Sequence, residues 1–278
     1  MIPLKDENPT TRTPILTFAI IIACVAAYFG PQDGVTDQID ALSFNLEYAA
    51  IPCELQTGEP LSLQEVEDTF NRGDTTACQD DEASPSVFPD KVVYLGVLTS
   101  MFLHGSIMHL LGNMWFLWIF GNNIEDRLGH VFFAVFYVAG GVFATIAHYL
   151  VQPSSTIPVV GASGAIAAIM GAYALWFPNA PVRTLIIYFL RDISAKWFLG
   201  IWFVTQFFTG TNSGVAWMAH VGGFVFGAVI ALIVRGTEWA ERSLNRSDNP
   251  LEWDYTGGAG RGPYPHVFER QRGDVTDF

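Results

Sequence analysis

Residues 214–234 read GVAWMAHVGGFVFGAVIALIV, an apolar stretch without Asp, Glu, Lys or Arg. A helix needs about 20 mostly apolar residues to cross the roughly 30 Å of hydrocarbon in a bilayer. Two more uncharged stretches, 131–151 and 157–178, are also long enough. The sequence therefore predicts that lipid surrounds much of this chain.

Three further apolar stretches are shorter or less sharply bounded: 14–29, one that ends in 107–121, and 197–210. Counting them all predicts six spans. The expected fold class is an all-α membrane protein, a six-transmembrane-helix bundle with a long outer loop between helices 1 and 2. Residues 184–190 are too short to span, so we interpret them as lying at the interface or leading into the fifth span.

Composition excludes one large class of function. Charged residues make up 15% of the chain and hydrophobic residues 50%, and the formal net charge is -13. No basic surface is available to neutralise a phosphate backbone, so nucleic-acid binding is excluded. The acidic excess lies in residues 31–92, where one plausible amphipathic piece occurs at 62–70.

The distribution of Lys and Arg predicts the orientation, because short cytoplasmic loops are enriched in both. With both termini inside, 12 of the 14 Lys and Arg residues fall on the inner side. We expect an integral protein of a prokaryotic cell membrane. Its predicted parts are a cytoplasmic N-terminal segment 1–13, a first transmembrane helix 14–30, an acidic extracytoplasmic loop 31–92, a core of helices 2 to 6 at 93–235, and a polar cytoplasmic tail 236–278.

The first apolar stretch permits a second interpretation. Lys5 and Arg12 precede it, as in a secretory signal, and residues 21–24 loosely fit a lipoprotein cleavage box. Removal of this segment would leave five spans.

Two cysteines, Cys53 and Cys78, lie in the acidic segment on the predicted outer side, where disulfides persist. Either the two cysteines form a disulfide or both are free thiols, and the sequence leaves both alternatives open. A mass increase of two hydrogens on reduction would identify the disulfide. Cys24, in the first span, is interpreted as a small apolar residue.

Polar residues gather at one depth of the predicted bundle. His109 with Asn113, Ser163, and His220 each lie within a few residues of the outer end of their own helix. An unpartnered polar group in lipid costs a few kcal/mol, so such groups need a reason to be there. His109 and Asn113 are four apart and share a helix face, from which both can donate hydrogen bonds to an oxyanion.

The neighbours of Ser163 and His220 favour a meeting of the two residues. Ser163 lies in GASG, where small residues allow close approach and the amide hydrogens of a helix start favour developing negative charge. Gly223 and Gly227 have the small-xxx-small spacing that lets helices touch, and Gly164 offers a matching surface. His220 can then act as the general base of Ser163. No carboxylate lies within these spans, so the arrangement is a dyad.

Four segments resemble, in order and spacing, the signature segments of the rhomboid intramembrane serine proteases: HLLGN at 109–113, GNNIEDRLG at 121–129, GASG at 161–164 and AHVGGFVFG at 219–227. The resemblance covers about residues 93–235 and implies a rhomboid-like bundle with its catalytic core there. It implies that Ser163 is the nucleophile, that His220 is the general base and then acid, and that His109 and Asn113 stabilise the oxyanion. The implied reaction is hydrolysis of a peptide bond in or near the transmembrane segment of a single-span or other membrane protein.

The sequence also departs from some family members. An aromatic residue often follows the nucleophile by four positions and stacks on the histidine, whereas this chain has Ala167. A Trp and Arg pair of the first loop is not evident in 94–98. By analogy with the family, Trp202 and Gln206 line the gap through which a substrate enters; packing in the core or against lipid is an equal alternative.

The remaining ionisable residues near the spans have structural interpretations. His104 and His148 are expected to be interfacial or structural, and His130, at the inner end of span three, structural. Glu125 and Arg127 are expected to tie down the inner turn through a local salt bridge.

Metal and cofactor sites are not expected. The chain has no HExxH motif, no CxxC motif and no glycine-rich phosphate loop. We therefore predict no metal and no cofactor, with the bilayer and membrane-protein substrates as partners. Two other functions remain open: a non-catalytic rhomboid-like protein that binds transmembrane clients, and a small transporter or channel. The first expects loss of the serine or the histidine, and the second expects ionisable residues through the full bilayer depth.

Overall fold

The computed structural model describes residues 1–32, 38–78, 84–209 and 216–235. The predicted tail at 236–278 lies outside these residues. Ten α-helices, two 3-10 helices and three strands are seen in the described ranges: β1 Ile2–Asp6, α1 Ile15–Phe29, α2 Gln38–Tyr48, α3 Pro52–Thr57, α4 Leu63–Phe70, η2 Val93–Leu95, α5 Gly96–Thr99, η3 Ser100–Phe102, α6 Ile107–Leu128, α7 His130–Val151, α8 Ser163–Trp176, β2 Pro181–Ile186, β3 Phe189–Ser194, α9 Ala195–Gln206 and α10 Trp217–Arg235.

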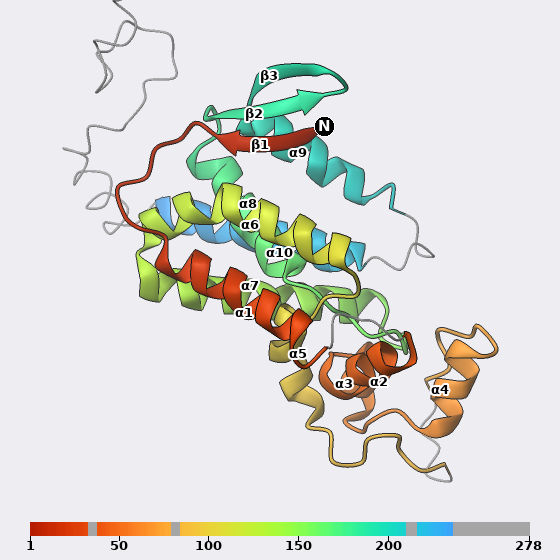
Figure 1. Ribbon diagram of the computed structural model, residues 1–278. Helices are drawn as coiled ribbons and strands as arrows, with labels where there is room; N and C mark the ends of the chain where they lie inside the picture. The colour runs from red at the N-terminus through yellow and green to blue at the C-terminus, as the bar shows by residue number, and fades with distance from the viewer. Residues whose placement is uncertain (33–37, 79–83, 210–215, 236–278) are drawn as a thin grey trace, which may run out of the picture.

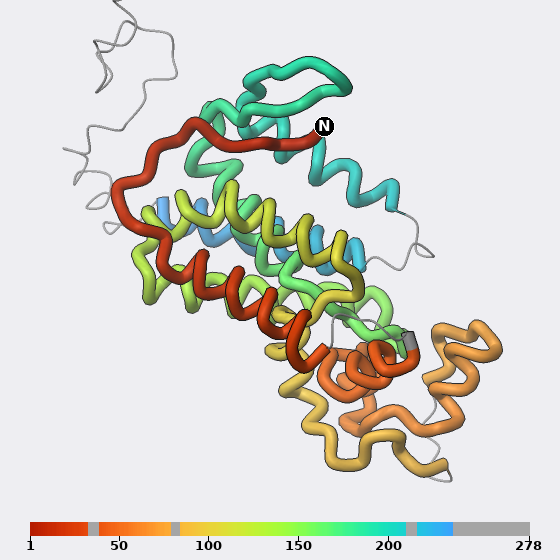
Figure 2. The backbone as a smooth tube through the Cα atoms, viewed as in Figure 1, coloured from red at the N-terminus to blue at the C-terminus, as the bar shows by residue number. Residues whose placement is uncertain are grey.

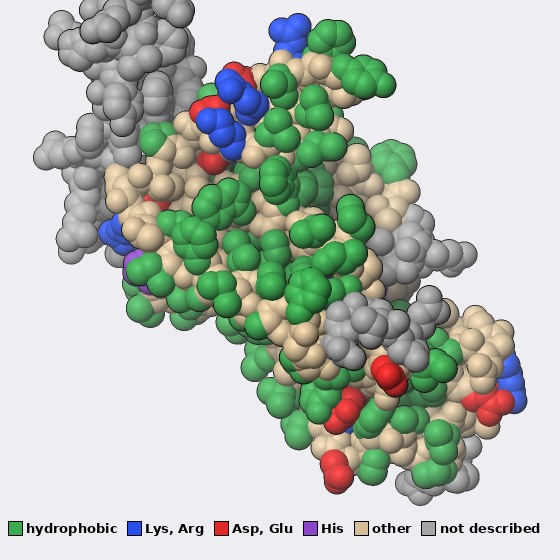
Figure 3. Space-filling view, in the orientation of Figure 1, with side chains coloured by type: hydrophobic (Ala, Val, Ile, Leu, Met, Phe, Trp, Pro, Cys, Tyr) green, Lys and Arg blue, Asp and Glu red, His purple; other side chains and the backbone are tan. Residues whose placement is uncertain are grey.

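Helices α1, α6, α7, α8 and α10 form a bundle. The sheet lies beside α6 and α9, and α2 to α4 lie at the end of the bundle next to α5 (Figure 1). Helix α8 is the centre of the bundle: every residue from Gly164 to Tyr173 is buried, and α8 contacts α6, α7, α9 and α10. The exposed residues of the outer helices are large and apolar. Figure 3 shows hydrophobic side chains over the visible flank of the bundle, with charged side chains mainly toward its two ends. This distribution matches a bilayer around the flank.

Two helices, α7 and α10, are long and apolar enough to cross a membrane. Val93–Phe102 and Ile107–Leu128 together make a third such span if this pair, bent by 75°, is counted as one. In the same described ranges α1 and α8 are shorter apolar helices of 15 and 14 residues. Length and composition therefore identify two or three spans, and the count of six stays a prediction.

The protein is mostly helical, as its expected fold class requires, but the described residues also contain a small sheet. Three antiparallel strands form a sheet in the order β1-β2-β3, and β2 and β3 are a hairpin made from the segment that we had assigned to the interface or to the start of the fifth span. This segment is rich in β-branched and aromatic residues, and its side chains alternate in burial along β2. Pairing between strands satisfies backbone groups that a seven-residue helix would leave largely unpaired.

The N-terminal segment is fixed to the bundle at the C-terminal end of α6. Figure 2 shows the chain leaving the sheet and passing around this end into α1. Glu125 of α6 accepts hydrogen bonds from the amides of Leu16 and Thr17 at 2.8 Å, and thereby satisfies the free N–H groups at the start of α1. Arg127 lies over the ring of Trp176 at 4.7 Å. The C-terminal end of α6 therefore contacts both α1 and α8, which is more than the local salt bridge that the sequence suggested.

Outside the bundle, α2 to α4 form a small subdomain with its own hydrophobic cluster of Leu46, Ile51, Cys53 and Leu61. A disulfide joins Cys53 to Cys78, so of the two alternatives the structure has the bridge. A capping box of Ser62 and Glu65 begins α4, the helix that occupies the predicted amphipathic piece. The disulfide and the hydrophobic cluster together stabilise this subdomain, which lies in a segment that the sequence predicted to be mainly a loop.

The packing of α10 on α8 depends on two glycines. A Cβ at Gly227 would lie 1.8 Å from the carbonyl oxygen of Ala168, and a Cβ at Gly223 would lie 2.1 Å from that of Gly164. Backbone atoms cannot yield as a flexible side chain can. The two helices therefore approach more closely than any larger residue would allow.

We predict that Gly227→Ala lowers the melting temperature of the protein in detergent, because overpacking of this kind costs about 1 to 3 kcal/mol. Gly200→Ala on α9 is the matched control, since a Cβ there meets no atom within 4 Å. Differential scanning fluorimetry of both variants measures the effect. Equal melting temperatures for the two variants would contradict the packing argument.

A second prediction concerns Asp6 at the end of β1. Tyr173 and Asn123 donate hydrogen bonds to its Oδ2 at 2.8 and 2.5 Å. Burial nevertheless raises the pKa of the Asp6 carboxyl from 3.8 to about 7, with the Tyr173 hydrogen bond opposing the shift. The folded protein thus holds a proton that the unfolded chain releases above about pH 4, so stability must fall as the pH rises from about 4 to about 7.

Replacing the carboxyl by an amide removes this titration but keeps an oxygen acceptor. We expect the melting temperature of wild type, relative to that of Asp6→Asn, to decline between about pH 4 and about pH 7 and to be flat above it. Thermal unfolding of both proteins across this pH range measures the difference. A constant difference across the range would show that Asp6 does not titrate there.

Candidate active site

Ser163 and His220 meet at the end of the bundle that faces α2 to α4. Ser163 is the first residue of α8, and His220 lies in the first turn of α10. The Ser163 Oγ lies 2.8 Å from the His220 Nε2. This is hydrogen-bond distance, and the Nε2 can accept the hydroxyl proton when His220 carries its own N–H on Nδ1.

The turn before Ser163 is held by backbone hydrogen bonds. The Gly161 amide donates to the carbonyl of Ser100 at 2.9 Å, and the Val159 amide donates to the carbonyl of Ala50 at 2.8 Å. Gly161 has φ +124°, a conformation that L side chains rarely adopt. The chain can therefore turn sharply and begin α8 at the serine.

Two side chains of α6 border this turn. A Cβ at Gly161 would lie 2.9 Å from the Nε2 of His109 and 3.4 Å from the Nδ2 of Asn113, so both groups lie against the backbone that leads into Ser163. The Asn113 Nδ2 is buried and has no hydrogen-bond partner in the described part of the chain. A buried amide donor without a partner is expensive, which makes it available to an incoming oxygen atom.

His220 is contacted from α9 as well. Its Nδ1 lies 2.8 Å from the Oε1 of Gln206, and its ring centroid lies 5.9 Å from that of Trp202 at an interplanar angle of 40°. Trp202 thus supplies the aromatic neighbour that Ala167 does not. The sequence analysis assigned Trp202 and Gln206 to a substrate gap or to packing, and it paired neither residue with His220. The available signal was the spacing of four, which places Trp202 and Gln206 on one face of the helix.

The other histidines occupy different places. His104 is fully buried with its ring 5.3 Å from that of His109, and its Nδ1 lies 3.2 Å from the carbonyl oxygen of Phe102. His148 is buried on α7. His130 Nδ1 lies 2.6 Å from Glu125 at the far end of α6. Among the five histidines within the described residues, only His220 is in hydrogen-bond contact with Ser163.

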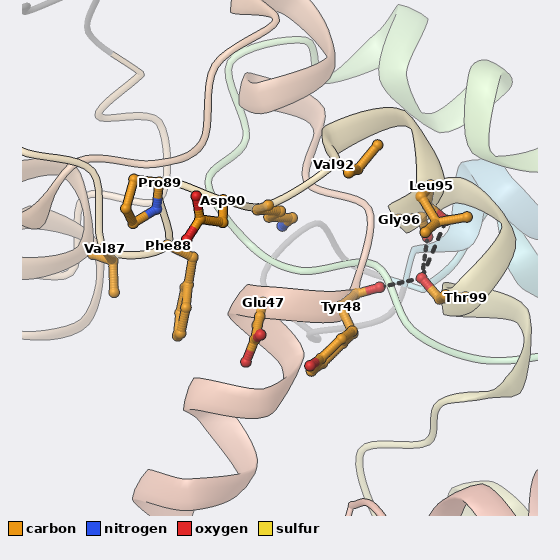
Figure 4. Close-up of a pocket in the computed structure, with 11 residues that line it drawn as sticks. Glu47, Tyr48, Val87, Phe88, Pro89, Asp90, Val92, Leu95, Gly96 and Thr99 are labelled. Atoms are coloured by element: carbon orange, nitrogen blue, oxygen red, sulfur yellow. Dashed lines mark hydrogen bonds between the residues drawn. The ribbon is translucent and has the colours of Figure 1, made fainter.

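Two other parts of the molecule have features of a binding site. Cys53, Glu65 and Cys78 bring three potential metal ligands together, but the disulfide occupies both sulfur atoms. A pocket of about 300 Å³ lies between α2, α5 and residues 87–92 (Figure 4). Its lining includes Tyr48 and Thr99, whose hydroxyl donates to the Tyr48 carbonyl, but neither Ser163 nor His220. This pocket is therefore separate from the contact between Ser163 and His220.

A serine in hydrogen-bond contact with a histidine, at the end of a buried helix in a bundle with an apolar flank, is an arrangement that serine hydrolase chemistry requires. A family model for the rhomboid domain matches residues 92–237. The chain belongs to the rhomboid family, which confirms the resemblance seen in its motifs. It is accordingly a mostly helical, integral membrane protein.

Several relatives show the same likeness. A presenilin-associated rhomboid-like protein A, mitochondrial, of Danio rerio is 30% identical over 143 residues, which cover 48% of this chain and 36% of the relative. The human presenilin-associated rhomboid-like protein, mitochondrial, is 31% identical over 149 residues, 49% of this chain and 37% of the relative. A rhomboid protease GlpG of Yersinia pestis (strain Pestoides F) is 30% identical over 130 residues, which cover 47% of this chain and 44% of the relative. The matches thus span less than half of these relatives.

Proposed function

We propose that this protein is an intramembrane serine endopeptidase that cleaves transmembrane segments of other membrane proteins with a Ser163/His220 dyad. The observation that carries the proposal is the 2.8 Å contact between Ser163 Oγ and His220 Nε2. Membership of the rhomboid family supports it, since relatives of this chain include a protein named as a rhomboid protease. In this proposal residues 93–235 are the catalytic core.

The first half of the reaction forms an acyl-enzyme. The Ser163 Oγ attacks the carbonyl carbon of the scissile peptide bond while its proton passes to His220 Nε2. The carbonyl oxygen becomes an oxyanion, to which His109, the Asn113 amide and the Ser163 backbone N–H can donate. The intermediate collapses, the C–N bond breaks, and the imidazolium gives its proton to the leaving amine.

The second half restores the enzyme. A water molecule gives a proton to His220 Nε2 and attacks the acyl carbonyl, and the Ser163 Oγ leaves with the proton that His220 returns. Each step uses groups of this chain and water, and no cofactor or metal enters the balance. Water must therefore reach a site at the outer end of the helices, which suits a position near the membrane surface better than the bilayer centre.

The proposed setting is the membrane of a prokaryotic cell, with six spans and both termini in the cytoplasm. The support is the asymmetry of Lys and Arg around the spans. The site then opens toward the outer side, where α2 to α4 and the Cys53–Cys78 disulfide also lie. A disulfide in this subdomain agrees with an oxidising outer compartment.

We predict that Ser163→Ala and His220→Ala each abolish cleavage of a single-span reporter in liposomes while leaving the melting temperature nearly unchanged. Ser154→Ala makes the same chemical change outside the site and should cleave normally. The products are measured on gels and by mass spectrometry. Cleavage by purified Ser163→Ala would refute the assignment of the nucleophile, and a wild type that binds but never cuts would indicate a non-catalytic relative.

The oxyanion assignment gives a separate prediction. Asn113→Ala removes one donor and should lower kcat by about 10² to 10³-fold with little change in KM, because the interaction forms only in the transition state. Asn122→Ala makes the same change nine residues further along α6, away from the site, and is the control. A rise in KM at constant kcat would show that Asn113 binds substrate instead.

A further inference from the structure

Gln206 ends α9 with its side chain almost fully buried against His220, at 7% exposure. Its amide makes two distinct contacts: the Oε1 faces His220 Nδ1 at 2.8 Å, and the Nε2 donates to the backbone carbonyl of Trp202 at 3.0 Å. The Nε2 also makes a longer contact, at 3.4 Å, with the hydroxyl oxygen of Thr205. The amide is therefore held at both of its polar atoms.

These contacts determine which way the amide points. A carbonyl oxygen can only accept a hydrogen bond, so the Trp202 carbonyl requires the NH₂ group of Gln206 on its side. Rotating the amide by half a turn would place the Gln206 Oε1 next to the Trp202 carbonyl oxygen, and neither atom can donate a hydrogen bond. The Oε1 must therefore face His220, and it can only accept there as well.

The fixed amide in turn determines the tautomer of His220. A neutral imidazole carries one N–H, and an acceptor at Nδ1 places it on that atom. The Nε2 then has a free lone pair, and this is the atom that lies 2.8 Å from the Ser163 Oγ. The opposite tautomer would place an N–H against the Ser163 hydroxyl and leave no base for its proton.

We propose that Gln206 is the positioning residue of this site: its amide, anchored on the Trp202 carbonyl, holds His220 in the tautomer that accepts the Ser163 proton. The inference rests on the proposed function, and it adds a third member to the pair that the sequence suggested. The ring of Trp202 borders the imidazole from the same helix and limits its rotation.

An amide suits this position because it orients the ring without a formal charge. A carboxylate would have to be buried among apolar side chains, where ionised groups carry a large desolvation penalty. The titratable groups that act on His220 are His109 of α6 and His148 of α7, while α8 and α9 present the Ser163 hydroxyl and the Gln206 amide. The amide is thus the acceptor in contact with Nδ1.

The test compares three changes at one position in the full-length protein. Gln206→Leu keeps the side-chain volume but removes the acceptor, and we expect kcat for a single-span reporter to fall at least about tenfold with KM little changed. Gln206→Glu restores an acceptor and should recover activity relative to Gln206→Leu. Gln56→Leu, the same substitution at an exposed position of α3, is the control and should cleave like wild type.

The rate–pH profile separates positioning from mere packing. A carboxylate at 206 stabilises the protonated imidazole, so the acid limb of the Gln206→Glu profile should move to higher pH than that of wild type. A residue that only fills space would give no such displacement. Equal kcat for wild type and Gln206→Leu, or an unmoved acid limb in an active Gln206→Glu, would overturn the proposal and leave the dyad standing.

A measurement that needs no activity keeps the two proposals apart. Nitrogen-15 NMR of histidine-labelled protein reports the tautomer, and the His220 signal is assigned by its loss in His220→Ala. We expect the proton on Nδ1 in wild type and a mixture of tautomers in Gln206→Leu. Wild type with the proton on Nε2 would refute the role of Gln206, whereas a correct tautomer in a protein that neither cleaves nor reacts with a fluorophosphonate would refute the proposed function alone.

Discussion

The close approach of α8 and α10 is the constraint on which the rest of the structure depends. Lipid tails are as apolar as leucine, so association of helices in a membrane relies on packing more than on exclusion of water. Gly223 and Gly227 let the backbone of α10 touch that of α8. Ser163 and His220 stand at the starts of these two helices, and their separation follows directly from this packing. A larger residue at either glycine would move the hydroxyl away from the imidazole.

Charge is kept out of the site, and polarity is supplied by neutral groups. Imidazoles and amides, from His109, Asn113, Gln206 and His220, come from three different helices and meet around one serine. Such groups donate or accept hydrogen bonds at a smaller desolvation penalty than carboxylates or ammonium groups. The carboxylates that the bundle does use, Glu125 among them, lie at the opposite end, where they accept hydrogen bonds from the N-terminal segment. The two ends of the bundle thus have different chemistry.

The sequence alone determined the solvent, the family and the residues at the centre of the site. Long uncharged stretches predict helices in lipid because the length of a span follows from the thickness of the bilayer. The positions of GASG and AHVGGFVFG singled out Ser163 and His220 because a membrane helix rarely carries polar groups without a reason. Local patterns of this kind are read directly along the chain.

Only the tertiary structure decided what pairs with what. The strand β1 pairs with β2 across about 180 residues, and no local pattern in either segment announces a partner. The aromatic neighbour of His220 comes from α9 in place of α8, and the acceptor at its Nδ1 is an amide, Gln206, because contacts between helices depend on their rotation and depth. Periodicity gives a face for each helix. Which faces meet is settled by packing among all of them.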